Sequence, residues 1–434
     1  NTVQNYLVQK AAAYASEKLN AKVQIESVDI ELFDKVSLNG FYVEDQRKDT
    51  MIYAAKAVAG FDLWCLVTDS RIYVTDVTLD GAVFHLKKQK DGQLNLRFLI
   101  DALKSDKKKE KSRMNYRVNH LTLRNSVFTY DDMRKPRKSG KMDYFHMRFS
   151  GINGEFRLDE YRKGFLDVRI LNFKCTEKGG LNVVDLKGRL VADTAQAKVS
   201  DFVLKMPSSE IRLDSVVANY DETWIKNVTR DASGKEKVKE SLDWKNVLLE
   251  ISLDNSVVAL RDLKFVLPRL GELSDKVELS THFKGTFGNM HLYNLVFNCD
   301  DGGAWGRMSV DLAGLPDINE TYAYVGIKEL GTTMPMLSDM IAKISGKPVK
   351  MPKQLNGLGK VKYRGSVSGY LTDLVAYGEV LSDIGLVNMD MHLESADEFK
   401  NVRYNGEVGA NNLNLAKLLG DKSQLGQTSF KLNS

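Results

Sequence analysis

A five-residue phrase recurs seven times along this chain of 434 residues: apolar, polar, Gly, any residue, apolar. In a β-strand, residues i, i+2 and i+4 share one face, so each glycine would lie between two large side chains on the apolar face. Glycine weakens a strand there unless the sheet bends or another group approaches the backbone. The phrase therefore predicts a sheet that curls around its apolar face, with glycines that serve curvature rather than a backbone of positive φ. At any single copy, an ordinary bulge or turn glycine is the alternative. The curving glycines are Gly40, Gly81, Gly154, Gly188, Gly285, Gly365 and Gly406.

An apolar face that curls without closing forms a groove. The side chains expected to line it flank the glycines, and charged neighbours such as Arg157, Lys187 and Arg189 are expected to face water. The predicted groove residues are Val74, Leu79, Phe84, Leu86, Ile152, Phe156, Leu158, Leu186, Leu190, Phe283, Phe287, Tyr363 and Val367.

Alternation of apolar and polar residues with period two runs through most of the chain and predicts strands. The fold class is therefore mainly β: an elongated, curled antiparallel sheet with an open groove, an N-terminal amphipathic helix and a few short helices. Helices are expected at residues 4–19 and 95–103, near Pro268, from a Thr332 or Thr333 cap to about residue 344, and after an Asn412 cap. Residues 229–241 read as an exposed loop. The expected domains are residues 1–104 and 105–434, the latter with a possible division near 225–245.

Composition narrows the class of protein. The hydrophobic fraction of 43% suffices for a core, while 27% charged residues argue against an integral membrane protein. The net charge of +5 is spread along the chain, so nucleic acid is not implied as a partner. The basic runs at 104–113 and 134–141 are solvated loops or, alternatively, a patch that touches anionic lipid headgroups. Both ends look cut, and no apolar run of about 18 residues exists, so any membrane anchor is expected outside this fragment.

Signatures of catalysis are missing from the sequence. Its 6 histidines stand singly, its 3 cysteines are far apart, and neither a metal-binding pair nor a Gly-rich phosphate loop is present. We therefore expect no enzyme, with no catalytic residue, no metal and no cofactor.

The first hundred residues contain an amphipathic helix followed by a fixed order of short strand motifs. These motifs are Val36-Ser37-Leu38-Asn39-Gly40, Tyr53-Ala54-Ala55-Lys56-Ala57-Val58, Val77-Thr78-Leu79-Asp80-Gly81 and Asp91-Gly92-Gln93-Leu94-Asn95-Leu96. In this order they resemble the N-terminal module of the TamB/AsmA-like family of bacterial envelope proteins. Residues 283–297, 361–374 and 413–426 are similar to repeat segments of the same family.

The resemblance implies a periplasmic protein of the Gram-negative envelope, anchored in the inner membrane by a helix before Asn1. Its implied function is outer-membrane biogenesis, with phospholipid or another acyl-chain lipid carried along the hydrophobic groove. The alternatives are a translocation and assembly factor for outer-membrane or secreted β-barrel proteins, and a rigid spacer without cargo. An outer-membrane assembly protein would be engaged through a C-terminal region that is not expected in this fragment.

Overall fold

A computed structural model describes most of the chain. The described residues are 2–31, 34–62, 72–106, 114–139, 142–162, 164–220, 224–230, 236–242, 246–265, 275–299, 302–315, 320–345, 352–370, 372–394, 403–420 and 426–433. Strands account for 68% of the structure and helices for 13%, which confirms the mainly β class. The helix expected near Pro268 lies outside the described residues.

Contacts divide the chain into two units, which are described separately. The first unit comprises residues 1–191, 203–208 and 262–271, and the second comprises residues 192–202, 209–261 and 272–434.

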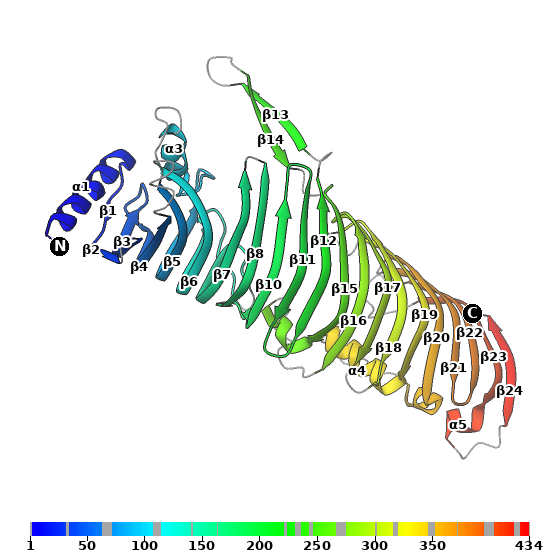
Figure 1. The fold of residues 1–434 in the computed structure, drawn as a ribbon. Helices are drawn as coiled ribbons and strands as arrows, with labels where there is room; N and C mark the ends of the chain where they lie inside the picture. The colour runs from blue at the N-terminus through cyan, green and yellow to red at the C-terminus, as the bar shows by residue number, and fades with distance from the viewer. Residues whose placement is uncertain are drawn as a thin grey trace. The chain divides into compact units, whose positions relative to one another are not determined.

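The first unit begins with helix α1 and continues as a series of long strands (Figure 1). Its elements are α1 (Thr2–Leu19), β1 (Val23–Gln24), β2 (Ser27–Glu31), β3 (Lys35–Glu44), β4 (Thr50–Asp62), β5 (Ile72–Lys88), α3 (Arg97–Asp106), β6 (Met114–Asp132), β7 (His146–Arg162), β8 (Phe165–Glu177), β9 (Asn182–Val183) and β10 (Asp185–Ala192). The helices expected at 4–19 and 95–103 are therefore confirmed, each to within a few residues.

Strands β5 and β6 pair in parallel, with Leu79 opposite Leu123 and Phe84 opposite Phe128. The sheet is therefore mixed, and the expectation of a wholly antiparallel meander is wrong at this point. The physical reason is the connection: parallel neighbours need a crossover of a dozen or more residues, and the segment that carries α3 provides it.

Two apolar clusters hold the first unit together. In one, Val23, Val43 and Met51 are buried beneath residues of α1 and α3, including Leu19 and Leu99. In the other, Ile152, Cys175 and Val183 are buried among side chains of β6, β7 and β8. Burial of its thiol raises the pKa of Cys175 to about 11, so the free cysteine is a neutral, apolar part of this core.

The second unit is a run of antiparallel strands in which the successive strands β15 to β24 pair with one another and β12 pairs with β15. Its sheet strands include β12 (Glu210–Asn219), β15 (Leu248–Ala259), β16 (Lys276–Gly285), β17 (Asn289–Cys299), β18 (Trp305–Ala313), β19 (Tyr322–Thr333), β20 (Lys360–Tyr370), β21 (Asp373–Ser382), β22 (Gly385–Glu394), β23 (Arg403–Asn414) and β24 (Gln427–Asn433). Strand β11 (Gln196–Lys205) contributes residues to both units.

Of the residues expected to form a loop at 229–241, the described ones (229, 230 and 236–241) belong to a two-stranded ribbon, and 231–235 lie outside the described residues. Strands β13 (Trp224–Arg230) and β14 (Glu236–Leu242) pair antiparallel, and Figure 1 draws them as a separate hairpin. The prediction was wrong because it required an apolar face, whereas a two-stranded ribbon is held by backbone hydrogen bonds and does not need one.

Short helices pack on the second unit at one end of its strands. They are α4 (Met334–Ser345), the 3-10 helix η4 (Lys353–Leu358) and α5 (Leu415–Leu419), while a further 3-10 helix, η2 (Leu260–Phe265), follows β15. Thr333 accepts a hydrogen bond from the Met336 amide at 3.4 Å, which supports the predicted cap of α4. The predicted Asn412 cap is wrong: Asn414 caps α5 by accepting from the Lys417 amide, because Asn412 is a bulge residue with φ of 51°.

The sheet is open and uncurled, so the expected curl is not found. The expected reason for the glycines is also wrong at five of the seven positions, where φ is positive: Gly40 (61°), Gly81 (57°), Gly285 (148°), Gly365 (158°) and Gly406 (148°). L-residues adopt such conformations only with strain, so these positions select glycine for its backbone freedom. Gly154 and Gly188 lie in β7 and β10 without a positive φ.

Ion pairs on the strands of the first unit make its stability depend on pH. Hydrogen bonds from Arg189 hold the pKa of Asp167 below its ordinary value, and those from Arg157 and Arg169 do the same for Asp159. As pH falls through 3.8, the ordinary pKa of an aspartate, the carboxylates of the unfolded chain are protonated before those of the folded chain. The free energy of unfolding therefore decreases as the pH drops from the ordinary pKa to the lowered one.

We therefore expect the Asp167→Asn variant to be less stable than the wild type at about pH 7 and to approach it at about pH 3. Denaturant midpoints measured across this range check the prediction. A stability gap that is independent of pH would show that the carboxylate contributes nothing through its charge.

Candidate functional site: the apolar face of the sheet

Strand register in the second unit places apolar residues directly opposite one another. Residues that face each other across paired strands lie on the same side of the sheet. One such line, here called the central row, crosses ten strands from β12 to β23 without a polar side chain. It consists of Val216, Ile251, Phe283, Leu292, Val310, Val325, Val367, Ala376, Met391 and Gly406.

A second line runs two residues away on the same face and is also apolar or glycine, ending on a tyrosine. This outer row consists of Ala218, Leu249, Gly285, Met290, Leu312, Ala323, Gly369, Leu374, Leu393 and Tyr404. Every member of the central row is half-buried, so water still reaches it. The two rows therefore form a continuous apolar surface that is not sealed inside a core.

Residues between the two rows point to the opposite face and are polar on most strands. Lys284 forms an ion pair with Glu250 at 2.5 Å, and His291 lies 2.6 Å from Asp311, each across adjacent strands. A third pair joins Arg364 of β20 to Glu329 of β19 at 2.6 Å. The strands alternate between half-buried apolar and exposed polar positions, most regularly in β17. The sheet of the second unit is thus two-sided, with one mainly polar face and one apolar face.

In the first unit, aromatic rings pair across neighbouring strands. Phe128 stacks on Phe84 with ring centroids 5.8 Å apart and lies 6.2 Å from Phe149 on its other side. On strands β7 and β8, the centroids of Phe156 and Phe173 are 6.0 Å apart. Cross-strand aromatic pairs stabilise a sheet by about 0.2–1 kcal/mol each.

Glycines on the apolar face give these rings room. A Cβ at Gly154 would lie 3.0 Å from ring atoms of both Phe156 and Phe173, and a Cβ at Gly365 would lie 2.9 Å from the Tyr363 hydroxyl. The carbonyl oxygens of Ser366 and Tyr377 lie 3.2 Å and 3.0 Å from the Tyr363 hydroxyl and are its two available acceptors, and burial raises the pKa of Tyr363. Close approach to the backbone, one of the two reasons that justify glycine in a strand, therefore applies here.

Bulges keep the apolar residues on one face. Leu79 and Phe84 are separated by five positions, which in a regular strand would put them on opposite faces. Gly81 has a positive φ, and Leu79 and Phe84 on either side of it lie opposite Leu123 and Phe128 of β6, which pack in one apolar cluster, so both side chains are on the apolar face. Asn125 (φ 43°) likewise lies between Leu123 and Phe128, and Asn294 (φ 49°) between Leu292 and Leu295.

Sequence reasoning missed these asparagine bulges and, with them, Phe128, Phe149 and Phe173. The sequence does carry a signal for such bulges: an Asn or Gly lies between two apolar residues that are separated by an odd number of positions. Neighbouring strands also supply hydrogen-bond acceptors: the Asn125 amide donates to Asn153 Oδ1 at 3.2 Å, and the Asn255 amide to Ser280 Oγ at 2.9 Å.

The predicted groove residues separate into four groups. Several meet: Phe283 and Val367 belong to the central row, and Ile152 and Leu186 pack in the same cluster of the first unit. Val74 is buried, with 7% of its surface exposed. Phe287 does not join them, because β16 ends at Gly285 and Phe287 lies in the following turn with 50% of its surface exposed. The remaining residues are half-buried within their strands: Leu79, Phe84, Leu86, Phe156, Leu158, Leu190 and Tyr363.

Two hollows in the second unit are lined mainly by polar residues, and the smaller one also borders Gly406 of the central row. The larger, of about 650 Å³, is lined by residues that include Arg364, Glu379, Asn388 and Lys431. The other lies beside Asp390 and His392. None of the thirteen predicted groove side chains lines either hollow. The described sheet thus offers an apolar surface, whereas polar side chains form most of the lining of these two hollows.

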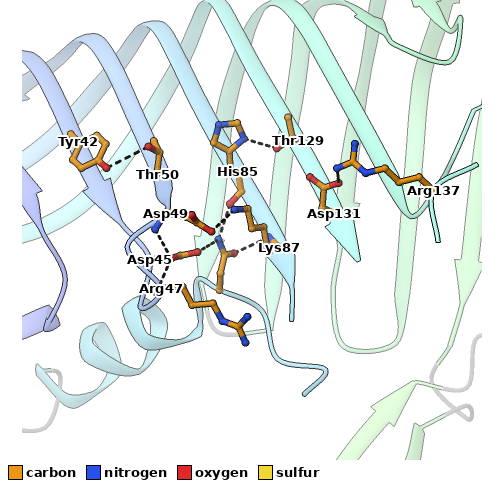
Figure 2. Close-up of polar contacts among 11 residues, drawn as sticks. Tyr42, Asp45, Arg47, Asp49, Thr50, His85, Lys87, Thr129, Asp131 and Arg137 are labelled. Carbon is orange, nitrogen blue, oxygen red and sulfur yellow. Dashed lines mark hydrogen bonds and ion pairs between the residues drawn. The ribbon is translucent and has the colours of Figure 1, made fainter. Parts of the chain in front are cut away.

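Asn95 of the family-like Asp-Gly-x-x-Asn motif has a structural role. Its side chain donates to the His85 carbonyl at 2.9 Å and to Asp45 at 3.3 Å, and accepts from the Lys87 amide at 2.9 Å. Asp45, only 2% exposed, also accepts from the Arg47 and Asp49 amides. Figure 2 shows this network between the β3–β4 turn and the end of β5. The motif therefore fastens α3 to the sheet.

None of the helices in the described part of the chain is long and apolar enough to cross a lipid bilayer. Comparisons with protein-family models, with curated proteins and with solved structures found no match to this chain.

Proposed function

We propose that this protein binds the acyl chains of phospholipid along the apolar face of its sheet. The observation that carries the proposal is the central row, an apolar line across ten strands whose members are half-buried, backed by the outer row beside it. An acyl chain laid on this surface would be shielded from water while its headgroup stays solvated.

The energetics favour such binding without a closed pocket. Each methylene removed from water contributes about 0.8 kcal/mol, so partial coverage of even half of an acyl chain yields several kcal/mol. The contact is non-directional, which suits a row of aliphatic side chains without a polar anchor. The affinity for a lipid therefore comes from the apolar contact area. Without a directional anchor, the lipid is free to slide along the row, as a conduit requires.

The test uses two neighbouring residues of β20 that point to opposite faces, Val367 and Ser368. We expect Val367→Asp to remain folded, because its site is half-exposed, but to bind a fluorescent phospholipid at least about tenfold more weakly. Ser368→Asp adds the same charge to the polar face and should bind like the wild type. Lipid retention after gel filtration and mass spectrometry of co-purified lipid provide the two measurements.

Two results would overturn the proposal. Unchanged lipid binding by Val367→Asp would show that the row carries no cargo, as the spacer hypothesis requires. Cooperative unfolding of Val367→Asp, with Ser368→Asp intact, would show that the row is an ordinary packed core.

The resemblance to the TamB/AsmA-like family supplies a setting for this proposal: the periplasm, an inner-membrane anchor and a role in outer-membrane biogenesis. This setting stays a prediction. The measurement that addresses it is fractionation of the full-length protein in its native cell.

A further inference from the structure

The loop between β6 and β7 exposes apolar side chains beside cations. Met133, Tyr144 and Phe145 have 48%, 58% and 39% of their surfaces exposed. Arg134, Lys135, Arg137 and Lys138 are exposed in the same loop. We call the described residues 133–139 and 142–145 the basic-aromatic loop.

Hydrogen bonds fix the shape of this loop. The Asp132 amide donates to the Phe145 carbonyl at 2.8 Å, which brings the two ends of the loop together, and the Met133 amide donates to the Lys88 carbonyl of β5 at 2.9 Å. The His146 ring lies 2.9 Å from the Lys135 carbonyl oxygen. Exposure of the apolar residues is therefore set by an ordered backbone and is not a by-product of a loose segment.

The carboxylates of the loop point inward. Asp132, with 2% of its surface exposed, binds both the amide and the guanidinium of Arg134. Asp143, with 8% exposed, accepts from the Lys138 amide at 2.7 Å and the Phe145 amide at 3.1 Å. Both carboxylates therefore bind groups of the loop itself, namely backbone amides and Arg134. The exposed charged side chains of the loop are cations.

Cations and rings are also close to each other on the outside. The Lys135 ammonium lies 5.6 Å from the centre of the Phe145 ring. At the loop's edge, Arg137 pairs with Asp131 (Figure 2), and 71% of the Arg137 side chain remains exposed. This combination of exposed cations, aromatic rings and a methionine is characteristic of surfaces that bind the interfacial region of a bilayer.

We propose that the basic-aromatic loop docks on the surface of an anionic phospholipid bilayer. Lysine and arginine side chains would approach the headgroup phosphates while Met133, Tyr144 and Phe145 enter the boundary between headgroups and acyl chains. The aliphatic Met133 favours a membrane over a nucleic acid, whose grooves are read by hydrogen-bonding groups. This inference concerns attachment to a membrane and goes beyond acyl-chain binding by the central row.

The test is co-sedimentation of the full chain with vesicles of phosphatidylcholine alone or with about a third phosphatidylglycerol. We expect binding to the anionic vesicles that weakens as salt is raised, and little binding to the neutral ones. Lys135→Glu with Lys138→Glu should lower anionic-vesicle binding at least about tenfold, since each basic residue near the surface contributes about fivefold or more. Tyr144→Ser with Phe145→Ser should also lower it.

Matched controls keep the test specific. Tyr161→Ser with Tyr377→Ser removes two tyrosines that are 75% and 62% exposed elsewhere, and Lys198→Glu with Lys328→Glu makes the same change in net charge at other exposed sites. Both controls should bind vesicles like the wild type, and so should Val367→Asp, which separates this inference from lipid binding by the central row. Equal binding to both kinds of vesicle, or full binding by both loop variants, would overturn the proposal.

Discussion

Gly365→Val is expected to destabilise the second unit by about 3 kcal/mol or more, through backbone strain and overpacking together. The φ of 158° is unfavourable for an L-residue, and a Cβ at this position would overlap the carbonyl oxygen of Tyr377 in the neighbouring strand. The obstacle is backbone and cannot rotate away as a side chain would. Urea denaturation followed by circular dichroism measures the loss.

Gly409→Val on β23 is the matched control. Its φ is not positive, and the nearest atom to an added Cβ, the Phe430 carbonyl oxygen, is 3.9 Å away. This variant should retain nearly all of the wild-type stability, since valine is a favourable residue in strands. If the two variants were equally stable, glycine at position 365 would have no conformational role.

Asn95→Ala is expected to cost the first unit about 3 kcal/mol or more. The substitution leaves the Lys87 amide, the His85 carbonyl and one side of the Asp45 carboxylate without their partner, and each buried unsatisfied group costs about 1–3 kcal/mol. The measurement is the denaturant midpoint, with Gln93→Ala as control because that side chain is exposed in the same turn. A loss no larger than that of the control would contradict the structural role of the motif.

A second substitution at the same position separates the effect of the lost hydrogen bonds on stability from the effect of an added charge. Asn95→Asp places a carboxylate where the amide contacts Asp45 at 3.3 Å, so two like charges would share a buried site. Protonation relieves this repulsion, and the stability gap to the wild type should therefore narrow as pH falls toward about 4. The gap for Asn95→Ala should change much less over the same range.

Several elements were predictable from local sequence because local physical chemistry decides them. The period-two alternation gave the mainly β class, and the helical spacing before residue 20 marked α1. Thr333 was recognisable as a cap because its oxygen serves an amide three residues away. Likewise, Phe283 and Val367 were placed on the apolar face from their strands alone, and both joined one row.

Tertiary structure decided which residues share that face. A bulge with positive φ at Asn125 shifts the alternation by one, so Leu123 shares a face with Phe128, and only the pairing of β6 with β7 shows where the shift falls. Phe287 left the face because β16 ends two residues earlier. The parallel pairing of β5 with β6 and the apposition of ten strands in one row depend on contacts between residues far apart in the chain. Local sequence fixes the tendency of a residue to be extended and apolar, whereas register is set by the partner strand, whose hydrogen bonds and side chains must fit along its whole length.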